Sequence, residues 1–137
     1  MEWNQTHRTG RGATNDQNDM RRNAIRPYVS YLRDINHALE KIVSFSKDLS
    51  FFQFQKGGVN RDAILFNFQI IGEAVKHVPR HVQSKNKHIP WNQMAALRND
   101  IVHEYFDPDD MIIWEIIKHN IPKNIQDLQF LIQQSTQ

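Results

Sequence analysis

The feature that most restricts the fold of this chain is a repeat of apolar residues at helical spacing. From residue 28 onward, apolar residues recur at intervals of four and three over one stretch, and the pattern returns after residue 60. This is the period of one face of an α-helix. The first stripe contains Tyr28, Leu32, Ile35, Leu39, Ile42 and Leu49, and the second contains Ile64, Phe68, Ile71, Val75 and Val78. The sequence therefore predicts two long amphipathic helices that pack side by side.

Capping and helix-breaking residues indicate where these helices begin and end. Ser50 is suited to cap a short helical turn, which the glycine pair 57–58 would end. Asn60 is suited to cap the second long helix, and Pro79 should stop it. Residues 80–90 are polar and indicate a loop with room for one helical turn.

The second half of the chain predicts two further helices. Trp91 leads an apolar stripe that runs to Tyr105, before the turn-forming residues 107–109. A last helix follows, which Pro122 should kink or divide. Four helices with short loops predict an all-α, antiparallel four-helix bundle with a short extra helix. Residues 112–117 are apolar on more than one face, which suggests burial against a second chain and hence a homodimer.

The domain organisation follows from the composition of the N-terminal region. Residues 1–24 are polar, with almost no aliphatic side chains, and we expect them to be a disordered extension of a helical domain formed by residues 25–137. The net charge is +2, and five Arg against three acids lie in residues 1–26, which leaves 12 basic and 12 acidic residues beyond. A neutral domain argues against a broad basic face that tracks nucleic acid.

Cysteine content and hydropathy exclude two further classes. The chain has no cysteine, which excludes disulfides and zinc–thiolate sites and suits a reducing compartment. No apolar run is long enough to cross a bilayer, and the N-terminus has no secretory pattern. We therefore expect a cytoplasmic protein that does not insert into a membrane.

The candidate chemical site lies near the end of the third predicted helix. Arg98, Asn99, His103 and Tyr105 supply a permanent cation, an amide, an imidazole and a phenol within eight positions. On an ideal helix Tyr105 is nearly in register with Arg98, whereas His103 lies about 140° away. Guanidinium binds phosphate oxygens and imidazole exchanges protons near neutral pH, as RNA cleavage by the 2′-hydroxyl requires. Spacing alone favours the simpler explanation, a solvated helix face with ion pairs of little consequence and an incidental His103.

Four segments in chain order resemble the HepT-like toxins of the HEPN superfamily. Arg98-x4-His103-x-Tyr105 resembles the family signature R-x4-H-x-Y. Residues 70–76 (IIGEAVK) are similar to its IGEA helix, residues 89–91 (IPW) to the entry of its catalytic helix, and residues 31–35 (YLRDI) to its first helix. The resemblance covers about residues 28–132 and does not include the N-terminal tail.

The resemblance implies an endoribonuclease toxin that acts as a homodimer with a shared cleft and needs no metal or other cofactor. Arg98 would bind the scissile phosphate, His103 would act as acid or base, and Asn99 would orient the phosphate or the imidazole. The implied partner is an MNT-type nucleotidyltransferase antitoxin that transfers AMP to Tyr105. An anionic adenylate beside Arg98 would occupy the cleft and compete for its charge. HEPN domains also occur as non-catalytic modules, so a helical dimer that binds a nucleotidyltransferase or a nucleotide is the alternative.

Two residues of the second long helix are expected to support this site. Glu73 could hold Arg98 in place, or pair with Lys76 or His77 instead, and we favour a structural role. Gly72 is costly inside a helix and is expected to permit close packing, with the motif helix as one candidate neighbour.

Two other patterns have simpler explanations. Glu73, His77 and His81 are four residues apart, a spacing that can bind metal, but Pro79 interrupts their helix, so a metal site is not expected. A group of aromatic residues could stack nucleobases but is expected to be core. Its members are Phe51, Phe52, Phe54, Phe66 and Phe68.

Overall fold

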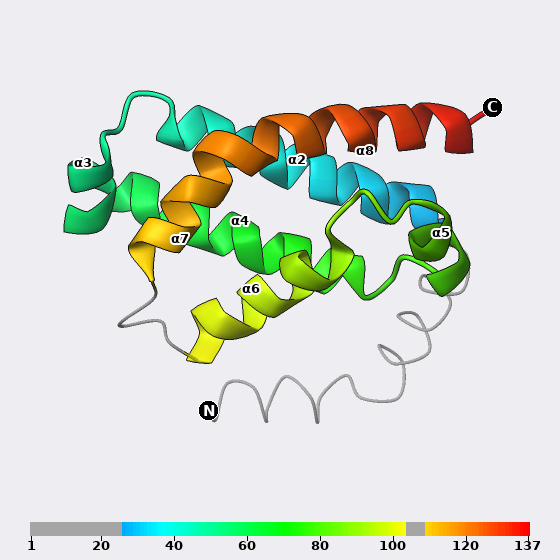
Figure 1. Cartoon of the computed structure of the whole chain (residues 1–137), viewed down its shortest axis with the longest axis horizontal. Coiled ribbons are helices and arrows are strands. Elements are labelled where there is room, and N and C mark those ends of the chain that lie inside the picture. The colour runs from blue at the N-terminus through cyan, green and yellow to red at the C-terminus, as the bar shows by residue number, and fades with distance from the viewer. Residues whose placement is uncertain (1–25, 104–108) are drawn as a thin grey trace, which may run out of the picture.

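The structure, a computed structural model, describes residues 26–103 and 109–137, and this part of the chain is helical without strands (Figure 1). The helices are α2 (Tyr28–Ser46), α3 (Phe51–Lys56), α4 (Val59–Val75), α5 (Arg80–Lys85), α6 (Trp91–His103), α7 (Asp110–Glu115), the π-helix η1 (Ile116–Asn120) and α8 (Ile121–Ser135). The all-α prediction is confirmed. The predicted extension, residues 1–24, lies outside the described residues.

Helices α2 and α4 form the centre of the fold, where they pack against each other in opposite directions (Figure 1). Their predicted stripes are confirmed, because Leu32, Ile35, Ile64 and Ile71 are buried between them. Each such side chain contributes about 1.5–3 kcal/mol through its removal from water. Helix α2 ends at Ser46, so Leu49 belongs to the following loop rather than to the helical stripe.

In the connection between α2 and α4, the predicted cap at Ser50 is confirmed and the predicted cap at Asn60 is wrong. Ser50 and Gln53 form a reciprocal capping box, in which each side chain accepts a hydrogen bond from the other residue's backbone N–H, at 3.1 and 2.9 Å. The prediction of Asn60 as a cap is wrong, because α4 already begins at Val59. Gly57 and Gly58 have φ of 102° and 118°, so the chain reverses through the glycine pair and leaves Asn60 in the first helical turn.

Pro122 divides the C-terminal segment, as predicted. It lies in the first turn of α8, where a missing N–H is tolerated, and the residues before it form η1 instead of continuing the α-helix. Proline cannot donate the i→i−4 hydrogen bond that the α-helix requires, and a wider turn absorbs this loss. The result is a helical bend between α7 and α8.

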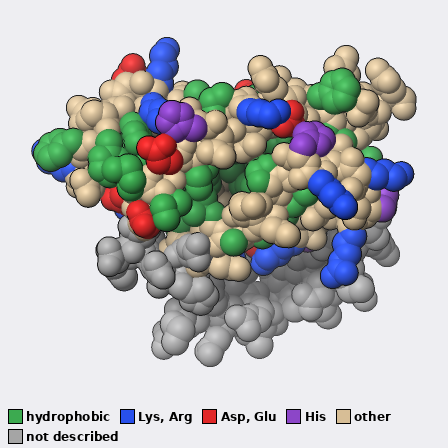
Figure 2. Space-filling view, in the orientation of Figure 1, with side chains coloured by type: hydrophobic (Ala, Val, Ile, Leu, Met, Phe, Trp, Pro, Cys, Tyr) green, Lys and Arg blue, Asp and Glu red, His purple; other side chains and the backbone are tan. Residues whose placement is uncertain are grey.

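The helices form a series of packed pairs rather than a closed bundle. Helix α8 packs on α2, α2 on α4, and α4 on α6, while α6 and α8 are not a closely packed pair in the described part of the chain. Figure 1 shows α6 leaning away from α8, and Figure 2 shows apolar side chains gathered across the middle of this face. The predicted antiparallel bundle is thus present but open on one side. Within the described residues, no helix has the length and apolar character that a membrane span requires.

The apolar residues near α7 are only partly used by the core. Ile113 and Ile117 are buried, whereas Met111 and Ile112 remain about half exposed, at 51% and 55%. The aromatic residues divide in the same way. Phe54 and Phe68 are buried, so the core prediction holds for them, but it is wrong for Phe52 and Phe66, which are 70% and 61% exposed.

Candidate functional site

Arg98 is positioned by the closest approach of two helices. A β-carbon at position 72 would lie 2.1 Å from Cβ of Arg98 and 3.3 Å from the carbonyl oxygen of Met94. Only glycine fits at such a contact, because carbon atoms normally approach to about 3.5–4.0 Å. Gly72 therefore lets α6 lie directly on α4, as predicted, and this contact fixes where the Arg98 side chain leaves its helix.

Two polar neighbours orient the guanidinium group of Arg98. Its Nη1 donates a hydrogen bond to Oδ1 of Asn99 at 3.1 Å, and its Nη2 lies 3.8 Å from Oε2 of Glu73. The Arg98 side chain remains 31% exposed. Because a guanidinium carries five N–H donors, these two contacts leave donors for a phosphate that approaches from solvent.

Glu73 is shared between two cations. It pairs with Lys76 at 3.3 Å on its own helix as well as with Arg98 across the helix contact. The predicted contacts of Glu73 with Arg98 and with Lys76 therefore both occur. The third candidate partner, His77, stacks on Tyr31 instead. One carboxylate shared by two cations leaves an excess of positive charge among these three side chains, which favours an anionic ligand.

His103 is the last residue of α6, five positions after Arg98 and thus about 7.5 Å further along the helix axis. Nothing is described of its side chain, and Tyr105 lies outside the described residues. The grouping of Arg98, His103 and Tyr105 that the motif predicts consequently stays a prediction. The structure brings together Arg98, Asn99 and Glu73.

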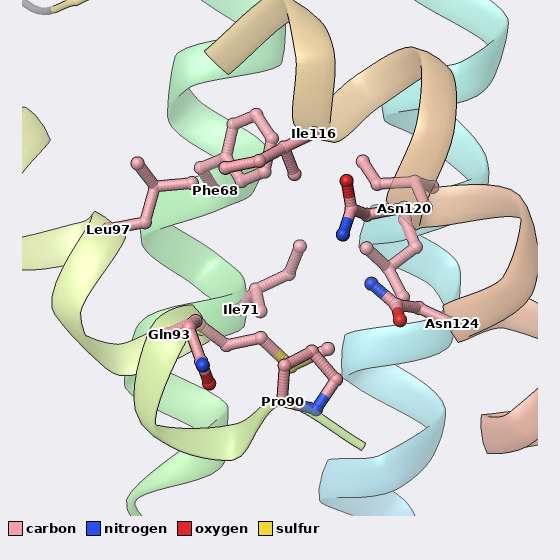
Figure 3. A pocket seen from close by; sticks show the side chains of 11 residues that line it. Phe68, Ile71, Pro90, Gln93, Leu97, Ile116, Asn120 and Asn124 are labelled. Atoms are coloured by element: carbon pink, nitrogen blue, oxygen red, sulfur yellow. The ribbon is translucent and has the colours of Figure 1, made fainter. Parts of the chain in front are cut away.

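A separate apolar pocket of about 170 Å³ lies between α6 and the η1–α8 segment (Figure 3). Asn120 and Asn124 bring amide groups to its wall, and Asn124 is only 9% exposed. Neither Arg98 nor Glu73 lines this pocket, so it is distinct from the Arg98 site. Sequence analysis missed both asparagines, although their i, i+4 spacing beside apolar residues was a visible sign of a shared helix face.

Metal-ligating side chains are not clustered in the described part of the chain. Among these residues no group of three or more His, Asp or Glu side chains lies close enough to hold a metal ion. His81, one member of the spacing noted in the sequence, lies on α5 beside the C-terminal end of α8 rather than with Glu73.

Comparison with known proteins gives a family for this chain. Residues 35–131 match the family described as Ribonuclease HepT-like. A probable ribonuclease HepT of Thermococcus cleftensis is 34% identical over 97 residues, which cover 71% of this chain and 88% of that protein. A presumed RNase of Caldanaerobacter subterraneus is 35% identical over 103 residues, covering 75% of this chain and 92% of the relative.

A presumed RNase of Methanocaldococcus jannaschii is 33% identical over 103 residues, which cover 75% of this chain and 85% of the relative. No solved structure matches the chain. The family match includes α4 and α6, and with them Gly72, Glu73, Arg98 and Asn99. The resemblance found in the sequence is confirmed, and the chain belongs to the HepT-like ribonuclease family.

Proposed function

We propose that this protein is the endoribonuclease toxin of a HEPN/MNT toxin–antitoxin system and that it cleaves RNA without a metal ion. The observation that carries the proposal is the Arg98 guanidinium, which contacts Glu73 and Asn99 at a close helix contact while its side chain stays 31% exposed. His103, which ends the same helix, supplies the imidazole of the family motif.

The proposed reaction uses the 2′-hydroxyl of RNA as the nucleophile. A base removes the 2′-hydroxyl proton, the 2′-oxygen attacks the adjacent phosphorus, and the bond to the 5′-oxygen breaks. The products are a 2′,3′-cyclic phosphate and a 5′-hydroxyl that has gained a proton. His103 acts as base or acid, a role that typically contributes about 10²- to 10⁴-fold. Arg98 stabilises the charge that develops on the phosphate, and loss of such a donor typically costs about 10²- to 10³-fold.

The proposed active form is a homodimer. Phe66 is 61% exposed and lies seven residues before Glu73 on α4, so both are on one helix face. Met111 and Ile112, on α7, are also exposed. A second copy would cover such side chains and bring two motif helices together around one cleft, which supports a dimer in which both Arg98 residues border the RNA.

The proposed partner is a nucleotidyltransferase antitoxin that transfers AMP to Tyr105. Adenylate is an anion, and beside Arg98 it would compete with RNA for the same guanidinium donors. Tyr105→Phe should resist this modification while retaining cleavage. Incubation with the antitoxin and ATP, followed by peptide mass spectrometry, tests the proposal, and AMP found on another residue with Tyr105 unmodified would contradict it.

The decisive test of the ribonuclease proposal is incubation of purified, unmodified protein with total RNA in the presence of EDTA. We expect cleavage by the wild type and a loss of about 100-fold or more in Arg98→Ala and His103→Ala. His119→Ala is the matched control, because His119 is 72% exposed on η1 and pairs only with Glu115 in the described structure. Undiminished cleavage by either motif variant would refute the mechanism.

The same assay separates the non-catalytic alternative. Arg98 could hold the phosphate of a nucleotide with the same donors, so a helical dimer that binds a nucleotide or a nucleotidyltransferase remains the second candidate. Binding of AMP that depends on Arg98, together with intact RNA after incubation, would favour it.

A further inference from the structure

Three side chains at the start of α2 and just beyond the end of α4 form a layered stack. The rings of Tyr31, on α2, and His77, just after α4, are stacked with centroids 4.4 Å apart and planes inclined by 15°. The guanidinium carbon of Arg26 lies 3.9 Å from the centroid of the same Tyr31 ring. Two groups at these distances on one face would overlap, so Arg26 and His77 cover opposite faces of Tyr31.

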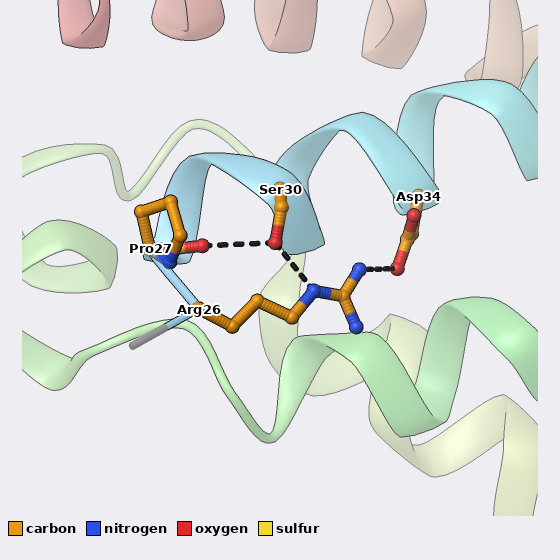
Figure 4. Close-up of polar contacts among 4 residues, drawn as sticks. All are labelled: Arg26, Pro27, Ser30 and Asp34. Atoms are coloured by element: carbon orange, nitrogen blue, oxygen red, sulfur yellow. Dashed lines mark hydrogen bonds and ion pairs between the residues drawn. The ribbon is translucent and has the colours of Figure 1, made fainter. Parts of the chain in front are cut away.

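The Arg26 end of this stack precedes α2 and is held by side chains of that helix. Arg26 donates hydrogen bonds to the hydroxyl of Ser30 and to the carboxylate of Asp34 (Figure 4). The Ser30 hydroxyl in turn donates to the carbonyl oxygen of Pro27 at 3.0 Å. The hydrogen bond that Arg26 donates to the Asp34 carboxylate also raises the pKa of Arg26, which keeps the guanidinium charged. The order Arg26, Tyr31, His77 is therefore preorganised before any ligand arrives.

The His77 end of the stack is open. Tyr31 is buried, at 8% exposure, because its ring is covered on both faces, whereas His77 is exposed. One face of the imidazole rests on Tyr31, so the solvent-exposed surface of His77 lies on the side of the residue away from Tyr31 or at the ring edge. A flat ring could extend the stack there as a fourth layer.

His77 follows closely in the chain after the residue that contacts Arg98. Glu73 contacts Arg98 at 3.8 Å, and His77 follows Glu73 by four residues, in the turn that ends α4, where its N–H donates to the carbonyl oxygen of Ala74. Lys76, which pairs with Glu73 at 3.3 Å, lies between the two in sequence. An open aromatic face beside two cations matches the combination by which proteins bind single-stranded nucleic acid, through base stacking and phosphate contacts.

We propose that His77 is a base-stacking residue for single-stranded RNA. An unpaired base lies on its open face, next to the nucleotide whose phosphate Arg98 binds, and Lys76 contacts the intervening backbone. This assignment rests on the proposed function and specifies its substrate as unpaired RNA. A base within a duplex is stacked on its neighbours and does not present a free face to His77.

The test compares His77→Ala with His77→Phe, which retains an aromatic ring without the imidazole. Binding of a short, non-cleavable 2′-O-methyl RNA is measured by fluorescence anisotropy, and cleavage of the same sequence as unmodified RNA is measured by steady-state kinetics. We expect the alanine variant to bind about tenfold more weakly, equivalent to about 1.4 kcal/mol, with most of the kinetic change in KM. The phenylalanine variant should recover most of the affinity, and His119→Ala should bind like the wild type.

The outcomes separate this inference from the proposed function. Equal RNA affinity of His77→Ala and wild type would overturn the stacking role, even where Arg98-dependent cleavage persists. A His77→Ala variant with a lower melting temperature but unchanged RNA affinity would also overturn the stacking role. The converse outcome is that the wild-type protein leaves RNA intact and still binds the 2′-O-methyl RNA in a way that depends on His77. This result would refute the proposed nuclease activity and support the stacking role of His77. Tighter binding of a duplex than of the single strand would also overturn the inference.

Discussion

The contact between Gly72 and Arg98 makes a testable link between packing and catalysis. In Gly72→Ala the added methyl group would lie 2.1 Å from Cβ of Arg98 and 2.7 Å from its Cγ. Carbon atoms need about 3.5–4.0 Å, so α6 has to move away from α4 by about 1.5 Å along that direction. The backbone of α6 carries Cβ of Arg98, so a side-chain rotation cannot relieve this overlap.

The expected cost has two opposing parts. Glycine to alanine inside a helix normally stabilises by about 1 kcal/mol. Overpacking that shifts a backbone costs about 1–3 kcal/mol, and the short distance at Gly72 favours the upper end. We therefore expect a net destabilisation of about 2 kcal/mol, which lowers the melting temperature by about 8 °C at about 4 °C per kcal/mol. Because Arg98 is the proposed phosphate-binding group, its displacement by about 1 Å should lower kcat/KM by about 100-fold.

Chemical denaturation and RNA cleavage assays measure these effects, and a double-mutant cycle identifies their cause. Arg98→Gly alone places a glycine inside α6 and should cost about 1 kcal/mol. In the double variant with Gly72→Ala, Arg98→Gly removes the β-carbon that the new methyl group would meet. The free energy of unfolding of the double variant should therefore be about 1–3 kcal/mol higher than the sum of the two single effects predicts. A Gly72→Ala protein that is more stable than wild type and fully active would refute the close contact and its role in positioning Arg98.

Three further predictions concern other parts of the chain. Arg61 pairs with Asp110 at 2.8 Å, and both side chains are mostly buried, so Arg61→Ala should lower the free energy of unfolding by about 2 kcal/mol. Replacing Asp110 by Ala in the same protein should recover part of this loss, because no unpaired carboxylate then remains. Additive effects of the two substitutions on the free energy of unfolding would contradict the pairing. Phe66→Ser should shift the proposed homodimer toward monomer in sedimentation equilibrium while the circular dichroism spectrum stays helical. An unchanged dimer mass would exclude this face from the interface. Deletion of residues 1–24 should leave RNA cleavage within about twofold of wild type, since the surplus charge of this segment acts only by weak, screened attraction; a tenfold loss would assign the tail to substrate binding.

Much of the fold was predictable because it depends on local physical chemistry. The apolar stripes of α2 and α4, the capping box at Ser50 and the break at Pro122 each follow from residues within a few positions of one another. The wrong prediction at Asn60 arose because Gly57 and Gly58 can both adopt positive φ and turn the chain earlier. The exposed positions of Phe52 and Phe66 were not predictable from hydrophobicity, since the burial of a side chain depends on which helices pack over it.

For the site, the sequence by itself determined which chemical groups are available. It placed Arg98, Asn99 and His103 on one helix, identified Glu73 as a neighbour, and indicated the family through their order. The tertiary structure alone decided how these groups meet: α6 rests on Gly72, Glu73 is shared by Arg98 and Lys76, and Tyr31 joins His77 from 46 positions away. The physical reason is that periodicity specifies which face of a helix is buried, whereas steric fit between faces selects the partner and the distance of approach.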